Sequence, residues 1–191
     1  MRPTVLLFDI DGTLITTGRS ARRAIERAFE RHTGFADAFD FPFDGMTDRA
    51  IVRTALRNVG LEATEAAIDA FLPLYLEVLE EELASAPVFR VHRGMERAVD
   101  TALERPNFAV GLGTGNVEPG AKAKLRRAGL HDRFAFGGYG SDDEDRPTLI
   151  RIGAERGAAR LGVPLAECRV VVIGDTPKDV HAARAIGAES I

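Results

Sequence analysis

The chain has 191 residues, of which 45% are hydrophobic, and a formal net charge of −4 at pH 7. This length fits one domain, or one domain with a substantial insertion, and the acidic balance without a Lys/Arg-rich run argues against a nucleic-acid partner. The single cysteine excludes an internal disulfide and a thiolate metal cluster, and it suits a reducing cytosol. No apolar stretch is long enough to cross a bilayer, and the N-terminal apolar run is too short for a signal peptide. We therefore expect a cytoplasmic protein with no membrane partner.

The first predicted element is a buried strand that runs directly into acidic residues. Residues 5–8 form an uninterrupted apolar run, which is typical of a strand covered on both faces, and Asp9-Ile10-Asp11-Gly12-Thr13 follows. Strand alternation puts Asp9 and Asp11 on one side of the chain, and an unpaired buried carboxylate is costly to desolvate. The pair therefore predicts either a solvated turn that closes the strand or a carboxylate metal site at its end.

A long helical block follows this strand. Apolar residues at helical spacing predict three helices, which begin with Ser20, Asp48 and Thr64 as N-caps and end near residues 33, 59 and 83. Pro73 lies inside the third pattern and should kink or split that helix. The alternating phenylalanines at 39, 41 and 43 are expected to pack under a loop. No strand-like alternation interrupts residues 16–87, so this stretch is predicted to be an all-helical insertion.

Beyond residue 87, predicted strands alternate with predicted helices. Helices are expected over 95–103, 119–128, 146–161 and 177–186, and strands over 108–112, 134–138 and 170–173. The strand over 134–138 ends in glycine and is expected at the outside of the sheet. Strands that alternate with helices indicate a parallel α/β sheet with right-handed crossovers. The α/β core is therefore assigned to residues 1–15 and 88–191, and the helical insertion to residues 16–87.

Polar residues come directly after three of the predicted strands. They are Asp9 and Asp11, Thr114 and Asn116, and Asp175 and Asp179. Because the carboxyl ends of parallel strands meet at one edge, these side chains are expected to share a polar pocket. Carboxylate oxygens without histidine or cysteine partners suit Mg²⁺ better than zinc, and Gly12 and Gly115 allow a close approach to the backbone. Such a set of groups points to phosphoryl transfer.

These motifs resemble those of the haloacid dehalogenase (HAD) superfamily. The DxDGT motif of that family matches residues 9–13, its Ser/Thr motif matches Thr114, and its GDTxxD motif matches residues 174–179. The helical block resembles the family's C1-type cap, and the phosphoglycolate-phosphatase-like enzymes are the most similar subfamily. The resemblance covers essentially the whole chain. It implies a Rossmann-like three-layer parallel sheet core, the HAD fold, with an inserted all-helical cap domain.

The resemblance implies a role for each motif residue. Asp9 would be the nucleophile that forms an aspartyl-phosphate, and Asp11 would protonate the leaving oxygen and then activate water. Thr114 and the backbone amide of Gly115 would hold the phosphoryl oxygens. Thr13 would support the turn and the proton relay. The substrate-binding set would be completed by Gly12 and Asn116 in the core and by Thr47 and Asp48 in the cap.

Mg²⁺ is the cofactor that the resemblance implies. The carboxylates of Asp9 and Asp175 and the backbone carbonyl of Asp11 would bind it, and Asp179 would be a further ligand or an anchor. The family usually has a lysine in its third motif, where this chain has Arg146 followed by proline. Arginine keeps the positive charge that would neutralise Asp9 and the phosphoryl group, so we assign this role to Arg146.

Other charged residues have simpler interpretations. Lys122 and Lys124 are alternatives for the third-motif cation, but lysines on a helix usually belong to a solvated face. The acidic run of residues 142–145 is likewise expected to be a solvated loop.

The end of the chain, at Ile191, comes where the family normally begins a further strand. An edge strand that lacks its neighbour presents unpaired backbone groups. The sheet is therefore expected to be shortened, or to be closed by a partner in a homodimer.

The function that these features favour is a Mg²⁺-dependent phosphatase that acts on a small phosphorylated metabolite through an aspartyl-phosphate. A β-phosphoglucomutase-like phosphotransferase retains the same motifs and stays an alternative, as does a non-catalytic HAD-like binding protein. A 2-haloacid dehalogenase needs neither Asp11 nor a metal, and a phosphonatase typically lacks the second aspartate. Asp11 therefore disfavours both of these.

Overall fold

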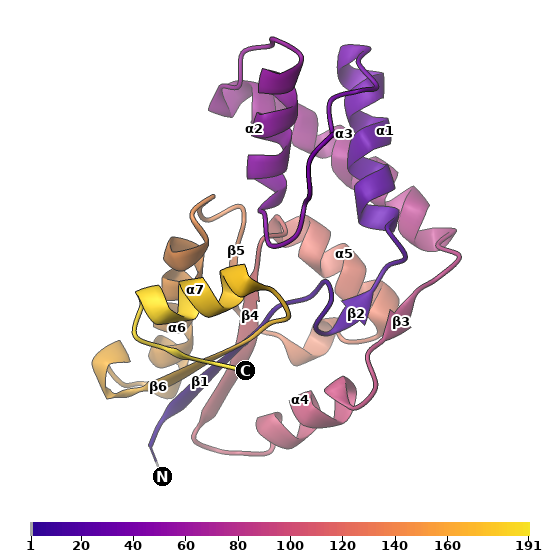
Figure 1. Cartoon of the computed structure of the whole chain (residues 1–191). Helices are drawn as coiled ribbons and strands as arrows, with labels where there is room; N and C mark the ends of the chain where they lie inside the picture. The colour runs from indigo at the N-terminus through magenta and orange to yellow at the C-terminus, as the bar shows by residue number, and fades with distance from the viewer. Residues whose placement is uncertain (1) are drawn as a thin grey trace.

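The computed structural model describes residues 2–191, and its centre is a five-stranded sheet in which neighbouring strands are parallel (Figure 1). The strand order is β5-β4-β1-β6-β7. The strands are β1 (Thr4–Phe8), β4 (Phe108–Thr114), β5 (Gly137–Tyr139), β6 (Arg169–Ile173) and β7 (Glu189–Ser190). The prediction of a parallel α/β sheet is confirmed, and β5 is the outer strand that was expected over 134–138.

Helices cover both faces of this sheet. One face carries α4 (Met95–Leu103), α5 (Glu118–Ala128) and the short helix η1 (His131–Arg133), and the other carries α6 (Arg146–Leu161), η2 (Leu165–Glu167) and α7 (Pro177–Ala185). Side chains alternate along β1, so that Phe8 packs with α4 and α5 while Val5 and Leu7 pack with α6 and α7. The core therefore has three layers, with the sheet in the middle.

The remaining helices pack around an apolar cluster of their own. They are α1 (Ser20–Thr33), α2 (Asp48–Asn58) and α3 (Glu65–Ala84). Figure 1 shows them beyond the carboxyl ends of the central strands. The chain reaches and leaves them through a two-stranded antiparallel ribbon of β2 (Ile15–Thr16) and β3 (Arg90–Val91). Phe39 is buried in this cluster and makes edge contacts with Phe29 and Phe43.

Helix α3 runs unbroken through Pro73, so this proline does not split the helix, which was one of its two predicted effects. A proline in a helix interior removes a backbone hydrogen bond and costs about 3 kcal/mol. Phe71, Tyr75, Val78 and Leu79 are all buried around this point. Full burial of one large apolar side chain contributes about 1.5–3 kcal/mol, so packing holds the helix together across the proline.

Two helices begin one residue earlier than the sequence predicts, at the residue that was expected to be the cap. Thr47, not Asp48, caps α2, because its hydroxyl accepts a hydrogen bond from a backbone amide of the first turn at 3.2 Å. Arg19, not Ser20, precedes α1, with a φ of 66° and no side-chain cap. Thr64 caps α3 as predicted. The carboxylate of Asp48 is thereby free to bind elsewhere.

The edges of the sheet are β5 and β7. β7 pairs with β6, and its other side has no strand partner within residues 2–191. Closure of this edge by a second copy of the chain stays a prediction. No helix in the same residues is both long and apolar enough to cross a membrane.

Gly138 lies where β5 meets α6 and has no room for a side chain. A Cβ atom there would overlap the carbonyl oxygen of Leu149. Gly138→Ala should therefore lower the free energy of unfolding by about 1–3 kcal/mol, because an added methyl group in a packed core forces the backbone to shift. The matched control is Gly120→Ala, where the new Cβ would meet its neighbours at 3.5 Å or more and helix propensity favours alanine. Denaturant unfolding measures both variants, and an equal loss in the two would contradict the prediction.

Candidate active site

Three carboxylates from two strand ends meet at the carboxyl edge of the sheet. Asp9 follows β1, Asp175 follows β6, and Asp179 lies in the first turn of α7. β1 and β6 pair with Phe8 opposite Ile173, so the residues after the two strands emerge side by side. One carboxylate oxygen from each aspartate lies within 4.8 Å of those of the other two. Such a spacing suits a single cation with oxygen ligands.

Two glycines allow this convergence. Gly12 has a φ of 87°, a conformation that favours glycine, and a Cβ atom on it would overlap the carboxylate of Asp175. A Cβ atom on Gly174 would overlap Asp179. The hydroxyl of Thr13 donates to Asp175 Oδ1 at 3.2 Å. Thr13 therefore orients a carboxylate of the cluster and does not itself line the neighbouring cavity.

Arg146 is the buried cation of the carboxylate cluster. Its Nη2 lies 3.3 Å from Asp9 Oδ2, and its Nε and Nη2 donate to Asp179 Oδ1 at 3.0 and 2.5 Å. The other oxygen of Asp179 accepts hydrogen bonds from the backbone amide and the hydroxyl of Thr176, at 3.1 and 2.6 Å. Because both of its oxygens are engaged, Asp179 anchors Arg146 and the start of α7. The structure thus places Arg146 beside Asp9.

The electrostatics of the cluster are dominated by the burial of Asp9. Burial raises the pKa of Asp9 from 3.8 to about 7, although the guanidinium of Arg146 lowers it. The carboxylates of Asp179 and Asp11 raise this pKa further, because nearby negative charges disfavour the ionised form. A divalent cation at the cluster would act in the opposite direction and favour the carboxylate form of Asp9.

A second network holds Asp11. Its Oδ2 accepts hydrogen bonds from Lys124 Nζ at 2.6 Å and from Asn116 Nδ2 at 2.8 Å. Asn116 Nδ2 also donates to Thr114 Oγ1 at 2.8 Å, and Asn116 Oδ1 accepts from Lys124 Nζ at 2.5 Å. The network therefore joins the ends of β1 and β4 to α5. Since Thr114 Oγ1 accepts in this network, its hydroxyl proton is available to a ligand.

Lys124 is only 2% exposed, so the prediction that it belongs to a solvated helix face is wrong. The signal for its burial was present in the sequence. Ala121, Lys124 and Ala128 follow the spacing of three and four residues that marks the buried face of a helix. Lys122 does lie on the exposed face, where it pairs with Glu118 at 2.8 Å.

The loop before α2 rests directly on the core beside the site. The amide of Asp48 donates to the carbonyl of Gly115 at 2.8 Å, and Asp48 Oδ2 accepts from the amide of Val117 at 2.9 Å. A Cβ atom on Gly115 would overlap the carbonyl oxygen of Met46, so the close approach requires glycine. Thr47 is buried at this contact, caps α2 and does not line the cavity. The structure therefore does not place Thr47 where a substrate contact was predicted.

A cavity of about 520 Å³ lies between the sheet edge and helices α1–α3. Its lining from the core includes Asp9, Asp11, Gly12, Thr114, Gly115, Asn116, Arg146 and Asp175. Its lining from the helical block includes Arg19, Phe43, Met46, Asp48, Ile51 and Tyr75. The volume suits a small-molecule ligand. Arg19 and Tyr75 were not singled out in the sequence, because neither belongs to a motif.

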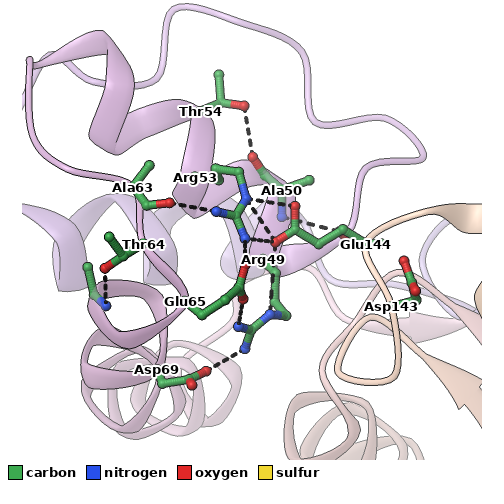
Figure 2. Close-up of polar contacts among 12 residues, drawn as sticks. Arg49, Ala50, Arg53, Thr54, Ala63, Thr64, Glu65, Asp69, Asp143 and Glu144 are labelled. Atoms are coloured by element: carbon green, nitrogen blue, oxygen red, sulfur yellow. Dashed lines mark hydrogen bonds and ion pairs between the residues drawn. The ribbon is translucent and has the colours of Figure 1, made fainter.

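Ion pairs tie the helical block to the core at one side of the site (Figure 2). Arg53 in α2 donates to Glu144 through Nε at 2.9 Å and through Nη2 at 2.6 Å. Arg49 and Arg53 both pair with Glu65 as well. Glu144 belongs to the acidic run of residues 142–145. The run lies in the loop before α6, as predicted, but Glu144 is only partly exposed and in addition pairs with α2.

Asp48 gives the folded protein a pH dependence that can be measured. Burial raises the pKa of its carboxyl from 3.8 to about 6, although the ammonium of Lys124 and the amide of Val117 lower it. Folded Asp48 therefore holds a proton that the unfolded chain has released, and the free energy of unfolding falls as the pH rises from about 4 to about 6.

In the metal-free protein, the free energy of unfolding should fall between about pH 4 and about pH 7 by about 3 kcal/mol less in Asp48→Asn than in the wild type. Asparagine does not titrate, but it can still accept the hydrogen bond from Val117. Denaturant unfolding of both proteins at about pH 4 and about pH 7 checks the difference. The same pH dependence in the two proteins would show that the Asp48 carboxyl is not perturbed.

The sequence matches a known family and a curated relative over almost its full length. The haloacid dehalogenase-like hydrolase family matches residues 3–187. A phosphoglycolate phosphatase from Xanthomonas campestris pv. campestris is 26% identical over 99% of this chain, and the match covers 82% of that relative.

Solved structures share the fold across the whole chain. CbbY from Rhodobacter sphaeroides, in complex with phosphate, has a TM-score of 0.71 at 18% identity, and the match covers 100% of this chain and 85% of that one. A putative phosphoglycolate phosphatase from Lactobacillus plantarum has a TM-score of 0.64 at 18% identity, with 100% and 85% covered. A putative beta-phosphoglucomutase from Thermotoga maritima has a TM-score of 0.58 at 20% identity, with 97% and 82% covered. Because the family matches from residue 3 to residue 187, this chain belongs to the haloacid dehalogenase-like hydrolases.

Proposed function

We propose that this chain is a Mg²⁺-dependent phosphatase that hydrolyses a small phosphomonoester through an aspartyl-phosphate on Asp9. The observation that carries this proposal is the meeting of Asp9, Asp175 and the guanidinium of Arg146 at the wall of one cavity. A carboxylate nucleophile, a cation site and a fixed positive charge are the groups that stabilise a phosphoryl transfer. The similarity to a phosphoglycolate phosphatase supports the same class of reaction.

The donor atoms of the site fit Mg²⁺. The carboxylates of Asp9 and Asp175 and the backbone carbonyl of Asp11 would hold the ion, with Asp179 as their anchor. The ligand group found among the described residues consists of aspartates alone, which suits a hard cation. Burial, and to a smaller extent the carboxylates of Asp179 and Asp11, raises the pKa of Asp9 to about 7, and a cation bound there would favour its ionised form. When bound, Mg²⁺ would neutralise charge that develops on the phosphoryl oxygens.

The side chains of the cavity support two successive displacements at phosphorus. In the first, a carboxylate oxygen of Asp9 bonds to phosphorus while the bond to the leaving oxygen breaks, and Asp11 gives a proton to that oxygen. In the second, Asp11 takes a proton from water, whose oxygen bonds to phosphorus and releases Asp9. The Thr114 hydroxyl, the Gly115 amide and Arg146 would hold the phosphoryl oxygens in both steps.

Phosphoglycolate is the first substrate to test, because the Xanthomonas relative is a phosphoglycolate phosphatase. This molecule carries a carboxylate in addition to its phosphate. Arg19 lines the helical side of the cavity, is exposed, and makes no ion pair with any residue in 2–191. Its guanidinium is therefore free to bind a second acidic group of a substrate.

Phosphate release from p-nitrophenyl phosphate tests the proposed class of reaction. We expect turnover with Mg²⁺, a loss of at least about 100-fold when EDTA removes the metal, and recovery when Mg²⁺ is added back. Turnover that is indifferent to EDTA would exclude the metal from the mechanism. Phosphate release from no member of a phosphomonoester panel, phosphoglycolate included, would favour a non-catalytic binding protein. Transfer of the phosphoryl group to a sugar phosphate instead of water would favour the mutase.

Replacement of the nucleophile tests the covalent step. Asp9→Asn should lower kcat by about 10⁴-fold or more, because an amide cannot form the aspartyl-phosphate. The matched control is Asp37→Asn, since Asp37 is exposed and lies outside the cavity lining. The control should keep wild-type turnover. Activity that persists in Asp9→Asn would rule out the covalent intermediate.

A further inference from the structure

We infer that Lys124 is a positioning residue that holds one carboxylate oxygen of Asp11, so that the other oxygen is presented to the leaving group of the substrate. This inference rests on the proposed phosphatase function, because it concerns the proton that Asp11 delivers. Lys124 itself need not touch the substrate, since it does not line the cavity.

The burial of Lys124 sets it apart from an ordinary surface lysine. Its side chain is 2% exposed, whereas that of Asp11 is 41% exposed and faces the cavity. An ammonium group that leaves water must be compensated by charged or polar partners. Lys124 finds them in Asp11 Oδ2 at 2.6 Å and Asn116 Oδ1 at 2.5 Å. The ammonium thus contacts Asp11 from the protein interior and not from the cavity.

Both donors to the Asp11 carboxylate reach the same oxygen. Oδ2 accepts from Lys124 and from Asn116, whereas no donor within residues 2–191 makes a hydrogen bond to Oδ1. A carboxylate that is fixed through one oxygen by two donors has lost the rotation that would misdirect its free oxygen. Oδ1 is thus the unpartnered oxygen of a residue that lines the cavity and lies two positions along the chain from the nucleophile.

Asn116, the second hydrogen-bond partner of Lys124, is itself held by hydrogen bonds. Asn116 is 5% exposed and donates to Thr114 Oγ1 at 2.8 Å, and its backbone carbonyl accepts from the Gly140 amide at 2.9 Å. The ammonium of Lys124 therefore bonds to a side chain whose own position is fixed. This arrangement explains why a long, flexible side chain can act as a fixed support for Asp11.

Misplacement of Asp11 should affect substrates unequally. When the bond from phosphorus to the leaving oxygen breaks, that oxygen receives the electron pair of the bond, and a strongly basic oxygen needs a proton at that moment. Phenolate is such a leaving group, whereas p-nitrophenolate is stable enough to depart without a proton. Loss of Lys124 should therefore slow phenyl phosphate more than p-nitrophenyl phosphate, two substrates of similar shape.

The experiment compares kcat/KM for these two substrates in wild-type enzyme, Lys124→Met and Lys122→Met. This parameter covers the steps up to phosphorylation of Asp9, so it reports on departure of the leaving group. In Lys124→Met we expect the loss for phenyl phosphate to exceed the loss for p-nitrophenyl phosphate by about tenfold or more. Lys122→Met changes an exposed lysine of the same helix and should leave both values unchanged. Equal losses for the two substrates in Lys124→Met would overturn the inference.

The design separates a structural effect from a positioning effect. Both substrates are measured on one preparation, so their ratio does not depend on the fraction of folded protein. If Lys124→Met does not fold, Lys124→Gln keeps a polar side chain at the buried site, and the same excess loss for phenyl phosphate is expected.

A crystal structure of the folded variant tests the orientation without any turnover. The carboxylate of Asp11 should leave the position that it has in the wild type. An unchanged Asp11 would overturn the inference even if the wild type is an active phosphatase. If the wild type releases no phosphate from either substrate, the proposed function fails, and this structure still decides whether Lys124 orients Asp11.

Discussion

The burial of the Asp9 carboxylate at the end of a parallel strand is the constraint on which the rest of the site depends. Removing a carboxylate from water is unfavourable, and the raised pKa of Asp9 shows that its neighbours only partly offset the cost. Arg146 supplies one positive charge, but it is shared with Asp179. The cluster therefore keeps an excess of negative charge that a divalent cation would neutralise. The close backbone at Gly12 and Gly174 allows this unfavourable arrangement to form.

The helical block and the core line the same cavity, so the position of the block on the core affects the shape of the proposed active site. The carboxylate of Asp48 accepts a hydrogen bond from the amide of Val117, just before α5. The loop that precedes α2 packs closely against Gly115. On another side, Arg53 pairs with Glu144, which lies two residues before Arg146 in the chain. The contacts that hold the block in place are thus adjacent to the residues that would hold the phosphoryl group. The assignment of residues 16–87 as a separate cap domain stays a prediction.

The fold was predictable from local patterns, because each central strand is an apolar run and each turn after it carries a motif. The meeting of Asp9 with Asp175 also followed from topology, since parallel strands end at one edge of a sheet. Lys124 was misjudged because the usual solvation of lysine outweighed its helical register with Ala121. The continuity of α3 across Pro73 could not be predicted locally, because the packing that holds this helix together comes from distant parts of the chain. Thr47 and Asp48 are both suitable caps, and only the contact with Val117 decides between them.

The most direct test of the account is a crystal structure of the protein with Mg²⁺ and beryllium trifluoride, which mimics a phosphoryl group bonded to a carboxylate. We predict that beryllium bonds to a carboxylate oxygen of Asp9, and that one Mg²⁺ is shared by Asp9 and Asp175. A trifluoride bound elsewhere, or an ion that Asp9 and Asp175 do not share, would contradict the central claim.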